Sequence, residues 1–141
     1  MTKHTDRPMQ AAAKTIEGVL TAFLAAQQDR LKPETYQKYE TIVELFQDFM
    51  NGYVYADLDG SDLELFEQLN NAEGDAQRDF CQIFGPTKIA DNIDEFLHYF
   101  MVRKVMNGKS LKPTAETVIK KLEKWLKEKD WFDPEETGPV T

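Results

Sequence analysis

The sequence predicts an all-α protein: a four-helix core made of two helical hairpins, with an acidic helical insertion between them. Apolar residues recur at intervals of three and four in each of four long segments, which is the period of a half-buried helix. The tripeptide Leu-Lys-Pro occurs at 31–33 and again at 111–113, each time after one helical segment and at the start of the next. Because each hairpin has one apolar stripe, the two hairpins bury their stripes against each other.

The first hairpin is predicted from helices at about 9–28 and 33–51. Pro33 separates them, because the residue before a proline is pushed away from helical φ and ψ. Asn51 and Gly52 supply the stop of the second helix. The expected buried positions are Ile16, Val19, Leu20, Phe23 and Leu24 in the first helix, and Tyr39, Ile42, Val43, Phe46, Phe49 and Met50 in the second.

The acidic insertion is expected at about 53–88. Ser61 and Glu64 match the spacing of a capping box, which predicts a short helix at 63–69. A second short helix is expected at 75–84, and a short strand at 53–55 is an alternative for which no pairing partner is evident. The inward positions of the second short helix are expected to be Phe80, Ile83 and Phe84.

The second hairpin, at 89–132, has the strongest helical pattern in the chain. Its first helix is expected to run from 89 to 105, and 107–110 is expected to connect it to the second. Pro113 has the fixed φ that suits the first turn of that second helix. The expected buried positions are Ile89, Ile93, Phe96, Leu97, Phe100, Met101 and Val105, followed by Val118, Ile119, Leu122, Trp125 and Leu126.

A chain of 141 residues has the length of one domain. We expect that domain at 9–132, with flexible tails at 1–8 and 133–141. No apolar run approaches the roughly 20 residues of a membrane span, and the polar N-terminus lacks the apolar core of a secretory signal. Cys81 has no second cysteine for a disulfide or a zinc site, so we expect a reducing, cytoplasmic setting.

The net charge of −8 is unevenly distributed. Residues 33–100 carry three basic and fifteen acidic side chains, whereas residues 101–130 carry nine basic and four acidic ones. The overall acidity disfavours indiscriminate binding to nucleic acid. The basic C-terminal quarter still allows a local contact with phosphate.

Both halves of the chain share a pattern: an aliphatic helix, a break containing Leu-Lys-Pro, and a further helix. The matching segments are 19–24, 31–35 and 36–49 in the first half, and 93–97, 111–117 and 118–126 in the second. This pattern resembles the N-terminal core-binding, or SAM-like, domain of the tyrosine recombinases (phage integrases). In that family the break reads like leucine-serine-x-x-threonine, and a helix that carries a tyrosine follows. The likeness covers most of 15–134 outside the insertion, and Asp133-Pro134 stands where the family's chain turns toward its catalytic domain.

The resemblance implies a four-helix bundle that helps to clamp duplex DNA. It does not imply an enzyme, because the family's catalysis needs a separate C-terminal domain with arginines, a His-x-x-Arg motif and a nucleophilic tyrosine. Only nine residues follow Phe132, so we expect that domain to be absent from this chain. His4 and Arg7 have the His-x-x-Arg spacing, but they lie in the polar N-terminal segment and are interpreted as a chance match.

The best candidate site for DNA is the basic surface of the last helix and the turn before it. Lys120, Lys124 and Lys127 fall opposite the apolar arc, which is centred near Leu122. The full set of candidate phosphate-binding residues is Lys109, Lys112, Lys120, Lys121, Lys124 and Lys127. The alternative is a solvated face on which the lysines pair with glutamates four residues away, namely Glu116 with Lys120, Glu123 with Lys127, and Lys124 with Glu128.

The helix at 33–51 carries the opposite charge on its outward side. Its acidic stripe consists of Glu40, Glu44 and Asp48. In the recombinase family this helix also approaches DNA, and carboxylates there would repel phosphate. The alternative function is therefore a protein-interaction domain without nucleic acid, which associates with itself or an adaptor partner through complementary charged faces.

No cofactor, metal or small-molecule substrate is predicted, and no membrane association. Glu95 and His98 have the spacing of a metal pair on one helix, but a di-iron bundle needs a second such pair, and the chain has only one other histidine. Residues 57–62 hint at a calcium loop. An EF-hand needs glycine at its sixth position, whereas here the glycine is fourth, so the segment is interpreted as a turn.

Overall fold

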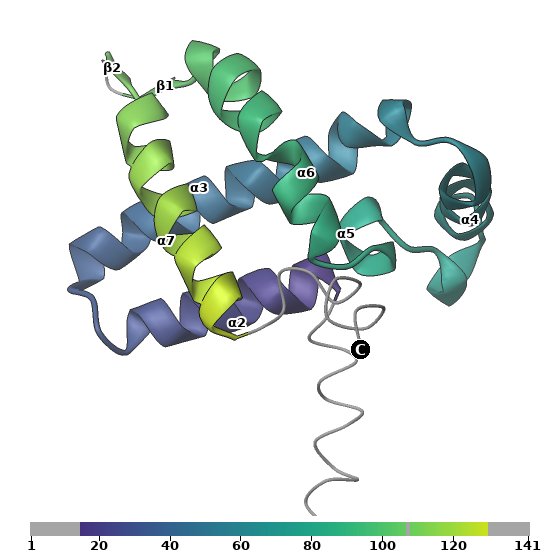
Figure 1. Cartoon of the computed structure of the whole chain (residues 1–141), viewed down its shortest axis with the longest axis horizontal. Helices are drawn as coiled ribbons and strands as arrows, with labels where there is room; N and C mark the ends of the chain where they lie inside the picture. The colour runs from purple at the N-terminus through teal and green to yellow at the C-terminus, as the bar shows by residue number, and fades with distance from the viewer. Residues whose placement is uncertain (1–14, 107, 130–141) are drawn as a thin grey trace, which may run out of the picture.

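The computed structural model describes residues 15–106 and 108–129, without the side chains of 105 and 106. The predicted helix start at residue 9, the two predicted tails, His4 and Arg7, and Asp133-Pro134 lie outside the described residues. The described chain is an all-α bundle, as predicted, with one small two-stranded hairpin (Figure 1). No helix within it is long and apolar enough to cross a membrane.

The first hairpin consists of α2 (Ile16–Gln28) and α3 (Pro33–Gly52), close to the predicted bounds. The Thr15 side chain accepts a hydrogen bond from the Gly18 amide at 3.1 Å and so caps the start of α2. Pro33 stands at the first turn of α3, where its missing N–H costs no hydrogen bond. All predicted core positions of both helices are buried except Leu24, which is half-buried.

The segment after α3 contains η1 (Val54–Asp57), α4 (Gly60–Asn70), η2 (Gly74–Ala76) and α5 (Phe80–Ile83). The predicted capping box at Ser61 and Glu64 is wrong, because α4 begins at Gly60 and its N-cap is Asp59, two residues before Ser61, without a side-chain hydrogen bond. The helix enters through Gly60, whose φ of +56° a residue with a side chain rarely adopts. Ser61 therefore lies inside the first turn.

The helix predicted at 75–84 is split into η2 and α5. The break falls before Asp79, whose side chain accepts a bond from the third residue of α5, while Gln82 Oε1 accepts one from the Asp79 amide at 2.9 Å. This is a capping box, so a new helix starts here instead of continuing from η2. Phe80 and Cys81 are fully buried, Phe84 is also buried, and Ile83 is half-buried.

The helical segment predicted at 89–105 begins and ends two residues earlier, at Thr87 and Arg103, and changes its winding along its length. It begins as α6 (Thr87–Glu95), widens to a π-helical turn, η3 (Phe96–Phe100), and tightens to a 3₁₀ turn, η4 (Met101–Arg103). The Met101 amide bonds to the Phe96 carbonyl, five residues back, which defines the π turn. Phe100, predicted in the core, is half-buried at the edge of that turn.

The predicted connection at 107–110 contains a short antiparallel hairpin. Its strands are β1 (Val105–Met106) and β2 (Lys109–Ser110), and Gly108 between them has a φ of +77°. Left-handed conformations of this kind are what a two-residue hairpin turn requires. The last helix, α7 (Lys112–Glu128), follows directly, and its predicted apolar positions are all buried.

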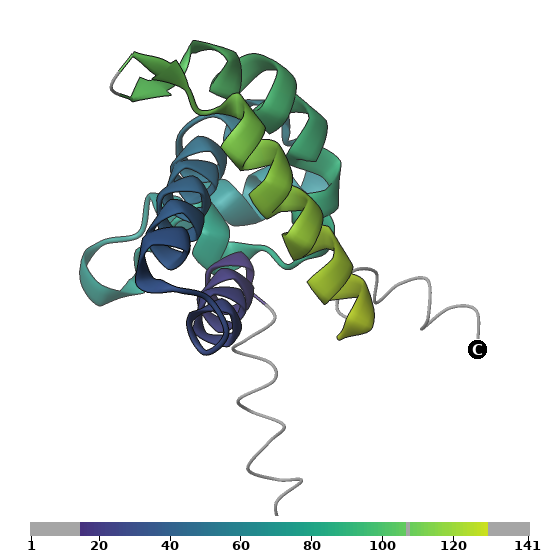
Figure 2. The ribbon, with the colours of Figure 1, turned by 90° about the vertical axis from the view of Figure 1, so that its left-hand side faces the viewer.

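The two hairpins share one core, as predicted. α3 runs through the middle of the domain, with α2 on one side and η3 on the other (Figure 1), and the turned view shows α7 packed across them (Figure 2). Phe23 of α2 contacts Trp125 of α7 edge to face, with ring centroids 5.5 Å apart. Phe46 of α3 contacts Phe96 of η3 at 4.7 Å. These aromatic contacts join the first hairpin to the second.

Candidate nucleic-acid interface

Three of the predicted lysines surround one small hollow between α7 and α3. The hollow has a volume of about 300 Å³ and is lined by Lys120, Lys121, Lys124, Thr117 and Tyr39. The lysines and Thr117 come from α7, whereas Tyr39 comes from α3 and is 7% exposed. Tyr39 packs beneath, stacked on Phe23 with ring centroids 6.1 Å apart. The core thus fixes the base of the hollow, and long cationic side chains form its rim.

A larger hollow of about 520 Å³ lies along the same border between the helices. Its lining from the second hairpin includes the predicted Lys109, together with Thr114 at the start of α7. Thr114, Thr117, Lys121 and Lys124 are separated by three, four and three residues, so they share one face of α7. The two hollows therefore follow one another along one side of α7, and together they are called the α3–α7 groove below.

The lysines of the smaller hollow are not paired with glutamates along the helix. Within the described residues, no carboxylate oxygen lies within 4.0 Å of the Lys120, Lys121 or Lys124 ammonium. Glu116 instead contacts Lys112, with 3.6 Å between Oε2 and Nζ. The expected pairs of Glu116 with Lys120 and of Lys124 with Glu128 are therefore absent from the structure. Fixing two long exposed side chains costs entropy that an ion pair in water hardly repays.

The remaining predicted lysines lie at the ends of this surface. Lys109 is exposed on β2 and lines the larger hollow. Lys112 is half-buried at the start of α7 and is held by Glu116. Lys127 is exposed in the last turn of α7. The structure thus brings four of the six lysines to the groove, namely Lys109, Lys120, Lys121 and Lys124.

The acidic stripe of α3 lies outside both hollows. Glu40 borders the turn between α2 and α3, next to Pro33 and Tyr36. Asp48 lies near Cys81 of α5. Burial raises the pKa of the Cys81 thiol, and nearby carboxylates raise it further; these are Glu17, Asp79 and Asp48. Because none of the three stripe residues lines the groove, their carboxylates do not form its wall.

Sequence reasoning missed the contribution of α3 to this site. Lys38 adds a cation to the larger hollow, and Glu34 adds the carboxylate that opposes it. Lys38 lies within the acidic middle of the chain, and its position opposite β2 depends on how α7 crosses α3. No local sequence pattern predicts how α7 crosses α3. The spacing of Thr114 and Thr117 relative to Lys121 indicates a shared helical face, but the sequence does not show which surface that face meets.

Two other candidate sites from the sequence, the Glu95–His98 pair and residues 57–62, do not form a metal-binding arrangement among the described residues. Glu95 and His98 are both exposed, on α6 and η3. Within residues 15–106 and 108–129, no group of three or more histidine, cysteine, aspartate or glutamate side chains could hold a metal ion.

Comparison with protein-family models, curated proteins and solved structures found no match to this chain. The resemblance to the recombinase core-binding domain therefore stays a prediction from the sequence pattern. Any function must be argued from the surface of the molecule itself.

Proposed function

We propose that this chain is a non-catalytic DNA-binding module that contacts the backbone of duplex DNA through the α3–α7 groove. One observation carries the proposal: Lys120, Lys121 and Lys124 gather around one hollow without a carboxylate partner among the described residues. Each such lysine can neutralise one phosphate and release its condensed counterion, which is the main source of affinity in backbone binding.

The chemistry of the groove suits phosphate better than base edges. Lysine presents a compact charge on a flexible stem, and Thr114 places a hydroxyl-bearing side chain on the same face of α7, whereas the Thr117 hydroxyl already donates to the Pro113 carbonyl at 3.2 Å. Such groups position a protein on DNA without reading its sequence. Because the chain has a net charge of −8, repulsion elsewhere opposes binding, so the affinity should be modest and strongly dependent on salt.

The test is fluorescence anisotropy with a labelled duplex of about 20 base pairs, titrated at several salt concentrations. The triple variant K120Q, K121Q and K124Q should reduce the steepness of log K against log salt by about 2.7, at about 0.9 for each phosphate that is no longer neutralised. The matched control S61E, Q28E and Q68E makes the same change in net charge at exposed positions of α2 and α4. It should leave the slope unchanged. Absence of wild-type binding at low salt contradicts the proposal.

A second candidate is association with another copy of the chain or with a charged partner protein. The observation that favours it is that no residue of the acidic stripe lines the groove, and within the described residues no ion pair joins the stripe to Lys120, Lys121 or Lys124, so both charged faces are available to a partner. Sedimentation velocity at low and high salt distinguishes the two functions. Salt-sensitive self-association without DNA affinity supports the second candidate and excludes the first.

A further inference from the structure

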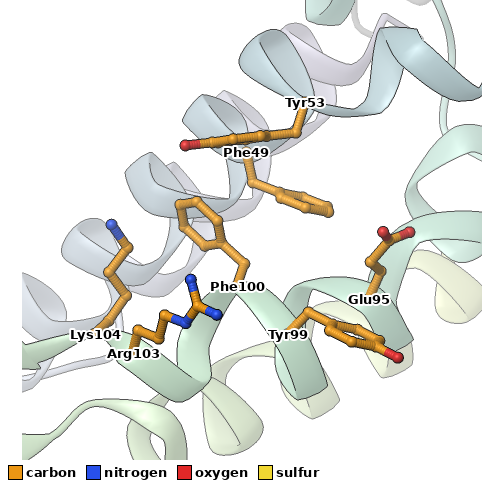
Figure 3. Close-up of a pocket in the computed structure, with 7 residues that line it drawn as sticks. All are labelled: Phe49, Tyr53, Glu95, Tyr99, Phe100, Arg103 and Lys104. Atoms are coloured by element: carbon orange, nitrogen blue, oxygen red, sulfur yellow. The ribbon is translucent and has the colours of Figure 1, made fainter.

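A second pocket lies between the end of α3 and the π-helical turn. It has a volume of about 370 Å³, at the small end of the range for ligand pockets, which is about 300–1,000 Å³. Phe49 comes from the last turn of α3, Tyr53 is the residue that follows α3, and Tyr99 and Phe100 come from η3 (Figure 3). The pocket is therefore built mainly from aromatic rings, and two of them, Tyr99 and Phe100, are consecutive residues of the π-helical turn.

Two of these rings are unusually exposed. Tyr53 is 61% exposed and Tyr99 is 75% exposed. Tyr53 is nevertheless fixed in place, because its ring lies 5.5 Å from Phe100 and 6.1 Å from Phe49, measured between centroids. Phe49 and Phe100 are themselves 5.2 Å apart. A ring that is held by neighbours while its own surface stays in water is ready to stack on a flat ligand.

The charges of the pocket favour an anionic ligand over a cation. Arg103 and Lys104 stand against one carboxylate, Glu95. Figure 3 shows Lys104 and Glu95 at opposite ends of the pocket, with Arg103 extending beside Phe100 between them. The Lys104 ammonium lies 4.5 Å from the centroid of the Phe100 ring, a cation–π contact that holds the charge at the rim. A flat ring attached to a phosphate matches this combination.

The pocket is also joined through the backbone to the basic surface of the second hairpin. Lys104 directly precedes β1, and its carbonyl accepts a hydrogen bond from the Leu111 amide at 3.0 Å, just before α7. Leu111 and Lys109 in turn line the larger hollow of the α3–α7 groove. A DNA strand that runs along the groove toward β2 therefore approaches the segment that carries Lys104 and the aromatic pocket.

From this arrangement we propose that the pocket binds an unpaired nucleobase of a single-stranded DNA segment adjoining the duplex. The base stacks on the exposed faces of Tyr53 and Tyr99, and Arg103 contacts the neighbouring phosphate. Aromatic platforms beside a cationic path are the common means of binding single strands without reading their sequence. The inference rests in part on the proposed function, since the groove is what directs the strand to the pocket.

The test compares a blunt duplex with the same duplex carrying a 3′ overhang of about five nucleotides, one of them 2-aminopurine. The overhang should raise the affinity of the wild-type protein about 5- to 150-fold, the effect of one stacked base. Quenching of 2-aminopurine fluorescence reports the stacking directly. Y99L, and Y99L combined with Y53L, should remove both effects. Y55L is the matched control, because Tyr55 is 45% exposed but lies outside the pocket.

The outcomes separate the inference from the proposed function. Binding of the blunt duplex without an advantage for the overhang overturns the inference and leaves the function standing. The inference is also overturned if the overhang still raises the affinity in the variant that combines Y99L with Y53L. Binding of the overhang DNA alone, abolished in Y99L, supports the inference and refutes duplex binding. Thermal melting of each variant shows whether the fold is retained, and Y99L tests the idea at a side chain that the core does not need.

Discussion

Truncation of Phe46, whose ring contacts Phe96, should cause a large loss of stability. Phe46 is fully buried near the middle of α3, and its ring centroid lies 4.7 Å from that of Phe96 in η3. Replacing a buried phenylalanine with alanine costs about 3–5 kcal/mol, because the packing of the ring disappears and a cavity remains. A domain has only about 5–15 kcal/mol of stability in total. The change Phe46→Ala should therefore remove a large share of it.

The effect can be measured by thermal and urea unfolding, followed by far-ultraviolet circular dichroism. At about 4 °C per kcal/mol for a domain of this size, Phe46→Ala should lower Tm by about 12–20 °C. Phe46→Leu is the matched control, because it keeps most of the apolar volume and should cost about 1–1.5 kcal/mol. A loss of less than about 1 kcal/mol in Phe46→Ala would refute the claim that this ring joins the two hairpins.

Two further predictions concern Cys81 and Glu34. Burial raises the pKa of the Cys81 thiol in the folded chain, so the unfolded chain releases this proton first as the pH rises above the ordinary pKa of 9.0. Above that pH, Cys81 should therefore lower the free energy of unfolding by about 1.4 kcal/mol per pH unit. Urea unfolding at several alkaline pH values checks this, and Cys81→Ala should lack that part of the slope. Glu34→Gln removes the carboxylate of the larger hollow and should strengthen duplex binding about 1.5- to 5-fold at low salt. Glu67→Gln, on exposed α4, should leave the affinity unchanged in the same anisotropy assay.

The helices were predictable where proline, glycine and the apolar period agreed. Pro33 and Gly52 mark both ends of α3, and its observed bounds differ from the prediction by one residue. The capping box at Ser61 failed because the motif is short, and the chain had already entered the helix through Gly60. A four-residue sequence motif such as the capping box does not predict the backbone conformation of the residue that precedes it.

The second hairpin shows a different limit. Apolar spacing continues through Phe100 and Met101, so the sequence predicted a single regular helix there. The π turn at η3 shifts the hydrogen-bond register by one residue, which leaves Met101 fully buried and Phe100 half-buried. Periodicity averages over several turns and does not detect one widened turn. Tyr99 lies outside the apolar arc of the sequence pattern, but that pattern does not show that its ring borders a pocket with Phe49 and Tyr53.

The lysines of the groove were visible in the sequence, whereas their surroundings were not. Lys120, Lys121 and Lys124 follow from their place on a helix outside the apolar arc. Their shared hollow depends on Tyr39, far away in the chain and brought close by the packing of α7 on α3. Pairing within the helix was equally compatible with the sequence, and side-chain positions were needed to decide it.

The contact between Phe23 and Trp125 also bears on how the chain folds as it is synthesised. It joins the first and last helices of the described residues, and the Ile16 amide donates to the Phe84 carbonyl at 2.8 Å, so α2 is held by two later segments. Contacts between residues so distant along the chain require large loops to close, which slows folding relative to helical proteins with mostly local contacts. The α2–α3 hairpin therefore emerges from the ribosome with part of its apolar surface uncovered. It stays so until α7 has been made.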